Sequence, residues 1–202
     1  YMQKDTLRYR IGVATYSVGV AYNNRKTSLQ FIQQEMNNIT ALSNETCQLG
    51  IQSRNMVFYI AKKDSPQPIR LMSSVGKQLP LYCTGLGRAL LAYKSEEEIR
   101  SLFPEVLTAY TPHTIATIND LLKELELTRQ RGYAVEHEET NLMVNCIAVS
   151  LDYNNAPIAA LSISIPTFRI SESKEKEAVQ ILWEAKQRIE THFKMYGVDF
   201  GN

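Results

Sequence analysis

Pro80-Leu-Tyr-Cys-Thr-Gly-Leu-Gly-Arg-Ala-Leu-Leu-Ala92 joins a turn built from Thr84, Gly85 and Gly87 directly to a strong helix-forming segment. The first N–H groups of a helix have no partner inside it, and the aligned peptide dipoles leave partial positive charge there. Small residues let a carboxylate or phosphate reach this backbone. The stretch therefore predicts either an anion pocket or an ordinary helix start after a strand that Pro80 ends, and the rest of the chain decides between them.

The composition is that of a globular protein with one full-sized domain and an appendage. The chain has 202 residues, of which 44% are hydrophobic and 21% are charged, values typical of a folded domain. Its 22 Lys and Arg residues nearly cancel its 21 Asp and Glu residues. A balanced domain lacks the large basic field that drives binding to a phosphate backbone. We therefore expect that the domain itself does not bind nucleic acid.

The cysteines and the apolar runs indicate a cytoplasmic location. Cys47, Cys83 and Cys146 are an odd number without pairwise spacing, which favours free thiols in a reducing compartment over a disulfide framework. No apolar run of the sequence approaches the roughly 18 residues that a membrane span needs, and the N-terminus lacks the apolar segment of a signal peptide. We expect a soluble cytoplasmic protein without membrane contact.

The first forty residues predict a strand followed by a long helix. Leu7, Tyr9 and Ile11 alternate with arginines, which is the period of a half-buried strand. Because a lone strand is not stable, its partners either are missing from this chain or lie elsewhere in the fold. Apolar residues at three- and four-residue steps then predict an amphipathic helix over residues 14–42, either continuous or broken near Asn23.

The remainder of the chain alternates between strand and helix patterns. Strands are predicted at residues 46–52, 56–61 and 69–74 as an antiparallel meander, and at residues 145–152 and 157–165 around a turn at Asn154-Asn155. Ser95 and Thr117 have the spacing of capping boxes, Gly132 has the position of a helix end, and a last helix is predicted from Ser171 to about Tyr196. The sum is an α+β domain whose mostly antiparallel sheet of five or six strands is flanked by helices.

The last two predicted strands each carry small, largely polar side chains on one face. These residues are Cys146, Ala148 and Ser150 on one strand, and Ala160, Ser162 and Ser164 on the other. An odd number of loop residues or a bulge near Asn154 would place Cys146 with both serines, whereas a two-residue turn alone would oppose them. Aligned faces would form the floor of a cavity. The alternative is a sheet face open to water.

Catalytic and metal-binding alternatives rest on isolated side chains. Cys83 and Cys146 are candidate nucleophiles. Either thiol would need His113 or His137 as its base, and nothing in the sequence places a histidine beside a cysteine. The run Glu136-His-Glu-Glu139 contains metal-ligating residue types, but adjacent residues on a strand point to opposite faces. We therefore predict no catalytic residue, no metal site and no cofactor.

Seven motifs, spread along the chain between residues 9 and 164, occur in a particular order and spacing. They are Tyr9-Arg-Ile-Gly12, Val75-Gly-Lys-Gln-Leu-Pro-Leu-Tyr-Cys-Thr-Gly-Leu-Gly-Arg-Ala-Leu-Leu-Ala92, Tyr110-Thr-Pro-His-Thr-Ile115, Arg129-Gln-Arg-Gly-Tyr-Ala134, Glu138-Glu139, Cys146-Ile-Ala148 and Ala159-Ala-Leu-Ser-Ile-Ser164. In these motifs the chain resembles the C-terminal effector-binding domain of the IclR family of bacterial transcriptional regulators.

The resemblance implies a domain organisation and a set of partners. Residues 1–12 would be the remnant of a winged helix-turn-helix domain, residues 13–25 a linker helix, and residues 26–202 the effector-binding domain. The implied fold is GAF/PAS-like, and the implied assembly is a homodimer or homotetramer that binds operator DNA through the winged helix-turn-helix domain, which is absent from this chain. The segment Ser164-Ile-Pro-Thr-Phe-Arg169 resembles regulators of ketodeoxygluconate and related sugar-acid catabolism.

The resemblance also implies a ligand pocket. Carried over position by position, the pocket consists of Thr84, Gly85, Leu86, Gly87, Glu136, Cys146, Ser162, Ile163 and Ser164. The chain departs from the family pattern at several points. Glu136 stands where Asp is usual, Met143 replaces a usual Gly, Ser150 replaces a usual Pro, and the segment over residues 146–152 is one residue shorter.

We therefore expect the effector-sensing and oligomerisation domain of a DNA-binding transcriptional regulator, a repressor rather than an activator. It would respond to a small organic acid such as a sugar acid or keto acid. Backbone N–H groups of residues 84–87 would hold the ligand carboxylate, and Ser162, Ser164 and Glu136 its hydroxyls. One competing hypothesis is a cysteine-dependent enzyme acting on a small carbonyl or carboxylate compound. Another is an interaction module whose pocket has collapsed around Met143.

Overall fold

The computed structural model describes residues 2–5, 8–23, 28–68 and 74–199 and contains one large antiparallel sheet. Its six strands lie in the order β5-β4-β3-β8-β7-β6. Their bounds are β3 Thr46–Ser53, β4 Met56–Lys63, β5 Gln78–Pro80, β6 Ala134–His137, β7 Val144–Tyr153 and β8 Ala156–Pro166. Every neighbouring pair is antiparallel, so the predicted class of fold is confirmed.

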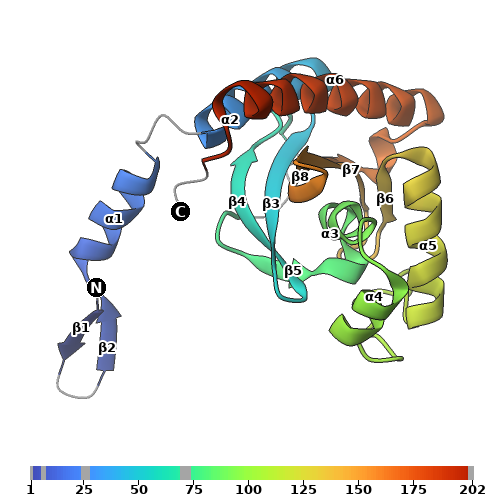
Figure 1. Ribbon diagram of the computed structural model, residues 1–202, viewed down its shortest axis with the longest axis horizontal. Helices are drawn as coiled ribbons and strands as arrows, with labels where there is room; N and C mark the ends of the chain where they lie inside the picture. Colours follow the sequence, from blue (N-terminus) through green and yellow to red (C-terminus); the bar gives the residue numbers. More distant parts are fainter. Residues whose placement is uncertain (1, 6–7, 24–27, 69–73, 200–202) are drawn as a thin grey trace.

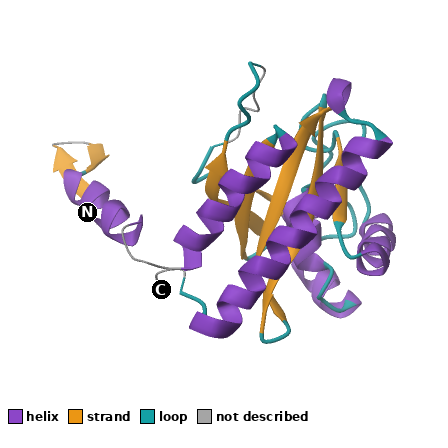
Figure 2. Cartoon of the chain, turned by 90° about the horizontal axis from the view of Figure 1, so that it is seen from above, coloured by secondary structure: helices purple, strands orange, loops and turns teal. Residues whose placement is uncertain are grey.

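Helices cover both faces of this sheet (Figures 1 and 2). One face carries α2 (Ser28–Ser43) and α6 (Glu172–Tyr196), which pack Ile32 and Leu182 against inward side chains such as Leu161 and Ile163. The other face carries the short 3-10 helix η1 (Leu81–Cys83), α3 (Gly85–Leu91), α4 (Glu96–Leu102) and α5 (Ile118–Arg131), and a further 3-10 helix, η2 (Thr167–Arg169), follows β8. Two separate hydrophobic clusters result, one on each face.

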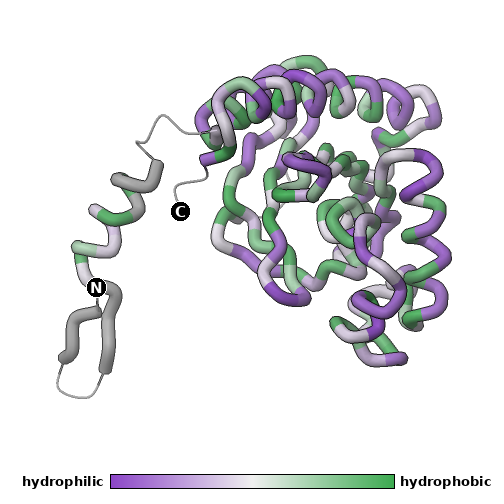
Figure 3. The backbone as a smooth tube through the Cα atoms, viewed as in Figure 1, coloured by the Kyte–Doolittle hydropathy of each residue, from purple (hydrophilic) through white to green (hydrophobic). Residues whose placement is uncertain are grey.

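Figure 3 shows hydrophobic residues gathered in the strands and hydrophilic ones along α5 and α6. Amphipathic helices bury their apolar stripe against such a sheet and expose the other side. In the described part of the chain, no helix combines the length and the apolar character that crossing a membrane requires.

The predicted helix ends are formed by side chains of the predicted capping residues. Ser95 makes both bonds of a capping box with Glu98. The Thr117 hydroxyl accepts from Asp120 N and donates to the Asp120 carboxylate, so that box closes on the side chain rather than on the backbone. Gly132 ends α5 in the left-handed region at φ 78°, a conformation that glycine adopts without steric cost.

The N-terminal elements differ in part from the sequence prediction. The predicted strand is β2 (Arg8–Ile11), and its partner is the adjoining β1 (Met2–Asp5), so the two form a small sheet of their own. The predicted helix is divided into α1 (Val13–Asn23) and α2, in agreement with a break near Asn23. The strand expected at residues 69–74 falls almost entirely outside the described residues.

The register of β7 and β8 is set by two features together. Asn154 and Asn155 form a two-residue turn with φ of 52° and 62°, which alone would place Cys146 opposite Ile163. A bulge after Leu151 shifts the pairing by one residue and places Cys146 opposite Ser164. The prediction that a bulge would align the two small polar faces is therefore confirmed.

Helix α3 approaches its surroundings at two glycines. A Cβ atom on Gly87 would lie 2.2 Å from the Leu81 carbonyl oxygen, and one on Gly85 would lie 3.3 Å from Cys146 Cβ. Contacts as short as the first are not possible for a methyl group, so only glycine lets η1 fold back against α3. The opening stretch of sequence therefore fixes how closely α3 lies on the sheet.

Gly87→Ala is expected to reduce the free energy of unfolding by about 1–3 kcal/mol, the usual cost of overpacking, because the added methyl must displace backbone. Gly85→Ala meets side-chain atoms at 3.3 and 3.4 Å and should lose clearly less. Urea unfolding of both variants compares them directly. An equal loss in the two would contradict this explanation.

Candidate functional site

The predicted site residues converge between α3 and the sheet. On β7 and β8, Cys146 pairs with Ser164, and Ala148 pairs with Ser162. Paired residues of neighbouring antiparallel strands share one face of the sheet. The start of α3 lies on this face, because a Cβ on Gly85 would be within 3.4 Å of the Cβ atoms of both Cys146 and Ala148. The structure thus brings the turn, the thiol and both serines together.

A chain of hydrogen bonds crosses this face. The Ser164 hydroxyl donates to Gln48 Oε1 at 3.0 Å and lies 3.1 Å from Cys146 Sγ. The Ser164 proton is directed at Gln48, and Cys146 also hydrogen-bonds to the Glu136 carboxylate. Gln48 comes from β3, so three adjacent strands contribute to the network.

Ser162 differs from Ser164 because its hydroxyl makes no hydrogen bond to the described part of the chain. Its side chain is 1% exposed, and its Oγ has no hydrogen-bond partner in the described part of the chain. Its neighbours across the strands are Ala148 and Gln48. A buried polar atom without a partner costs about 1–3 kcal/mol, so folded proteins rarely retain one. Such an atom points to a group that the isolated chain does not supply.

Glu136 forms the acidic wall of the site. It is paired with Cys146 across β6 and β7 and is 1% exposed. Its Oε1 accepts hydrogen bonds from Glu139 N at 2.5 Å and from Thr140 N at 3.3 Å. Burial raises the pKa of Glu136 to about 7, although these backbone bonds favour the charged form.

A buried ion pair ties α3 to the loop that follows β6. Arg88 is 2% exposed and forms an ion pair with Glu139 at 2.5 Å. Its other nitrogens donate to Tyr82 O at 3.0 Å and to Val135 O at 2.9 Å. Glu139 also accepts from Ile115 N at 3.2 Å. Arg88 therefore positions both the α3 turn and the backbone that binds Glu136.

Some backbone N–H groups of the turn before α3 already have hydrogen-bond partners within the turn. Thr84 Oγ1 caps α3 by accepting from Gly87 N at 3.0 Å, so that N–H is already bonded. The N–H groups of Gly85 and Leu86 donate to no partner among the described residues. The Leu86 side chain packs in the core, and the Ile163 side chain lies on the opposite face of the sheet, toward α2 and α6.

Three residues of the site were not predicted from the sequence. Gln48 could have been found, because it lies in an alternation of Thr46, Gln48 and Gly50 that matches the small polar faces of the last two strands. Tyr59 and Arg88 gave no such signal. Tyr59 on β4 is buried, and its pKa lies well above the usual range because of that burial and because of nearby Cys146 and Glu136.

The competing hypotheses find no support in this geometry. Burial raises the pKa of Cys83 to about 12 and that of Cys146 well above its usual value, whereas a nucleophilic cysteine requires the thiolate. No cluster of three metal-ligating side chains occurs among the described residues. Met143 has φ of 68° and a largely exposed side chain, so it keeps the backbone conformation of a glycine and does not fill the site.

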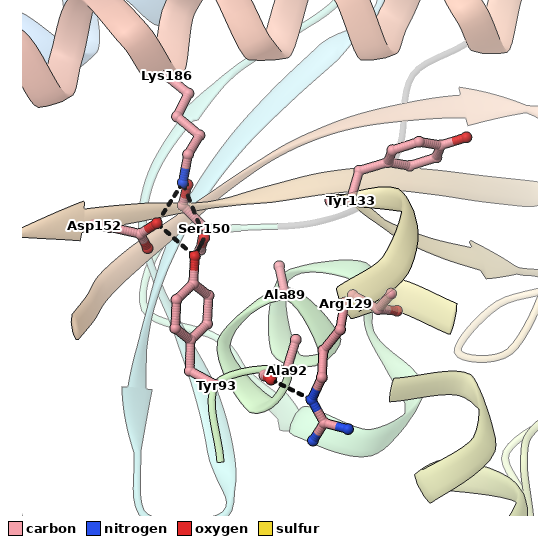
Figure 4. Close-up of a pocket in the computed structure, with 10 residues that line it drawn as sticks. Ala89, Ala92, Tyr93, Arg129, Tyr133, Ser150, Asp152 and Lys186 are labelled. Atoms are coloured by element: carbon pink, nitrogen blue, oxygen red, sulfur yellow. Dashed lines mark hydrogen bonds and ion pairs between the residues drawn. The ribbon is translucent and has the colours of Figure 1, made fainter. Parts of the chain in front are cut away.

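A separate cavity of about 410 Å³ lies at the other end of α3, and none of the nine predicted residues lines it (Figure 4). Lys186 binds Asp152 at 2.6 Å, Tyr93 donates to the same carboxylate at 2.5 Å, and Ser150 donates to Tyr93. Lys186 also binds Glu190. These donors, like the guanidinium of Arg129 in the same cavity wall, already donate to acceptors within the protein.

The α+β fold, with its antiparallel sheet covered by helices on both faces, agrees with the comparison to protein families. Consistent with this, the family model described as "Bacterial transcriptional regulator IclR C-terminal" matches residues 21–191. The chain belongs to the IclR family of bacterial transcriptional regulators, whose members are regulators and not enzymes.

Individual relatives agree with this assignment. The chain is 33% identical over 187 residues to the HTH-type transcriptional regulator KdgR of Dickeya chrysanthemi, covering 92% of this chain and 61% of KdgR. It is 32% identical to the HTH-type transcriptional repressor AllR of Escherichia coli K12, covering 91% of this chain and 68% of AllR. An IclR regulator from Alicyclobacillus acidocaldarius superposes with a TM-score of 0.84 at 28% identity, over 94% of this chain and 78% of that one.

Arg88→Met is expected to lower the free energy of unfolding by about 3–5 kcal/mol, because it leaves the Glu139 carboxylate buried without its cation. The double variant Arg88→Met/Glu139→Gln should lose less than the sum of the two single changes. Lys176→Met, which removes an exposed pair with Glu172, is the control and should cost below about 0.5 kcal/mol. Strictly additive losses in urea unfolding would argue against the coupling.

Proposed function

We propose that this chain is the effector-sensing and oligomerisation domain of a cytoplasmic repressor, and that its effector is a small organic acid such as a sugar acid or keto acid. The observation that carries this proposal is the Ser162 hydroxyl, which is buried and unpartnered at the centre of a polar cluster. An oxygen-rich ligand would supply the missing hydrogen bond.

In the proposed binding mode the ligand lies between α3 and β8. Its carboxylate accepts from the free N–H groups of Gly85 and Leu86, beside the Thr84 cap. Its hydroxyl or keto oxygens bind Ser162, Ser164 and Glu136. Since α3 has only seven residues, its dipole is short, and the serine contacts must provide much of the specificity. Gly87 and Cys146 shape the site through their positions, and Ile163 contributes backbone alone.

The proposed organisation assigns residues 1–12 to the wing of a helix-turn-helix domain, residues 13–25 to a linker and residues 26–202 to the sensor. The β1–β2 hairpin followed by α1 fits this order. The matched KdgR and AllR are HTH-type regulators, which supports DNA binding by the whole protein. Helix α1 carries no charged residue and exposes Val13 and Tyr16. Such an apolar surface supports a homodimer or homotetramer.

The proposed regulation is a shift between two arrangements of the oligomer. An effector changes such an equilibrium only by contacting the two states differently. Because α3 already lies at contact distance from β7, an outward shift of α3 to admit the acid is the change that would differ between the two states, and Arg88 would transmit it to the loop at Glu139.

Ser162→Ala should leave the free energy of unfolding unchanged or slightly raised, because no hydrogen bond within the protein is lost. The same change should weaken binding of the acid about tenfold, the value of one hydrogen bond. Calorimetric titration of the chain with D-gluconate and with pyruvate measures the affinity. Ser164→Ala is the matched comparison, and it should lose stability because the hydrogen bonds of Ser164 to Gln48 and Cys146 are removed. Unchanged affinity in Ser162→Ala would refute the proposed contact.

The DNA-binding proposal predicts that the full-length regulator retards a palindromic promoter fragment taken from beside its own gene, and that the bound acid releases it. The Ser162→Ala regulator should retain the DNA shift but need about ten times more acid for release. Retardation unaffected by any acid that binds the domain would count against an effector role.

A further inference from the structure

The titratable and charged groups that interact with Glu136 or with its partners come from several elements. They are Tyr59 of β4, Cys83 of η1, Arg88 of α3, Glu139 of the following loop and Cys146 of β7. The tyrosine and the two thiols stay neutral, because burial raises the pKa of each. The charges that remain are two carboxylates, Glu136 and Glu139, and one guanidinium.

Arg88, the one cation of this set, already uses its guanidinium nitrogens in hydrogen bonds within the protein. Arg88 is the only Lys or Arg that is buried among the side chains that the structure describes. Its Nε, Nη1 and Nη2 donate to Tyr82 O, Val135 O and Glu139. The pair with Glu139 is neutral as a whole, so an ionised Glu136 would carry the net charge of the cluster.

An acid bound at Ser162 would bring another carboxylate into this enclosed region. Two like charges close together in a poorly solvated site cannot both remain ionised without a cation. Glu136 is the group to which we assign the proton, because the Glu139 carboxylate is already paired with Arg88 at 2.5 Å. Burial already raises the pKa of Glu136 to about 7, so a neutral Glu136 is accessible near neutral pH.

We propose that the site binds its acid effector together with one proton, which resides on Glu136, and that it therefore accepts monocarboxylates and rejects dicarboxylates and phosphates of similar size. This inference rests on the proposed function. In the complex, a neutral Glu136 donates its proton to a ligand oxygen, while its Oε1 keeps the bonds from Glu139 N and Thr140 N. A second ligand carboxylate or a phosphate would find no second group of this kind to take up a proton, and no buried cation other than Arg88 among the described side chains.

The sign of the pH dependence follows from this linkage. Below about pH 7 Glu136 is protonated before the ligand arrives, and the affinity does not depend on pH through this group. Above that pH each binding event must take up a proton, so the affinity for a monocarboxylate falls, approaching about tenfold per pH unit.

The experiment is calorimetric titration of the chain with D-gluconate and pyruvate at pH 6.5, 7.5 and 8.5, each in two buffers of different ionisation enthalpy. At pH 8.5 we expect close to one proton taken up per acid bound, and at pH 6.5 clearly less than half a proton. D-glucarate, which adds a second carboxylate to the gluconate skeleton, should bind at least about tenfold more weakly than gluconate. Binding of gluconate or pyruvate without proton uptake at pH 8.5 would overturn this inference and leave the proposed function intact, whereas no binding of either acid would overturn both.

Two variants separate Glu136 from other carboxylates. Glu136→Gln should abolish proton uptake and give the same affinity at pH 6.5 and 8.5, while Glu136→Asp should keep the pH dependence. Glu35→Gln is the matched control, because Glu35 is buried in α2 and paired with Arg188 on the other face of the sheet. It should retain the wild-type proton uptake. If Glu136→Gln still takes up a proton, Glu136 is not the acceptor.

Discussion

The close approach of α3 to the sheet is the constraint on which the rest of this structure depends. Gly87 allows η1 to fold against the helix, and Gly85 lets the helix start rest on Cys146 and Ala148. A methyl group at Gly87 would overlap the η1 backbone and push α3 outward, and one at Gly85 would press on Cys146 and Ala148. The small residues of β7 and β8 form the matching surface, because large ones would occupy the space that α3 and its turn require. The position of the helix then decides which polar groups become enclosed.

The polar cluster is enclosed like a hydrophobic core, but its groups have a requirement that apolar side chains do not have. A hydrophobic core is stable because its atoms need no partners, whereas each enclosed hydroxyl or carboxylate must be hydrogen-bonded. Here most groups are satisfied by one another, as in the chain from Cys146 through Ser164 to Gln48. This internal network leaves two features open. The Ser162 hydroxyl has no hydrogen-bond partner in it, and it does not fix whether Glu136 carries a proton. Both would be determined by a bound acid, which is why a ligand and a proton belong in the same description of the site.

Prediction from the sequence succeeded where local physics dominates. Capping residues such as Ser95 and Ser171, the glycine at position 132 and the period-two pattern of β7 and β8 specify their own backbone, and the structure agrees with each. It indicated a strand ending at Pro80 and strand geometry near Glu136 but gave no bounds for β5 and β6, because their three and four residues are too few for a period to be recognised. Arg88 was overlooked because an arginine in a helix is usually solvated, and only the packing of α3 buries it against Glu139.

The sequence by itself determined the α+β class, the small polar faces of the last two strands and the resemblance to one regulator family, since these follow from periodicity and from motifs in fixed order. Tertiary structure alone decided the register, because a bulge of one residue after Leu151 reverses which face Cys146 shares. It also decided that Gln48, Tyr59 and Arg88 join the site, and that the only buried cation of the described side chains is already paired. Charge balance in an enclosed site depends on contacts between residues far apart in the chain, and no local pattern contains that information.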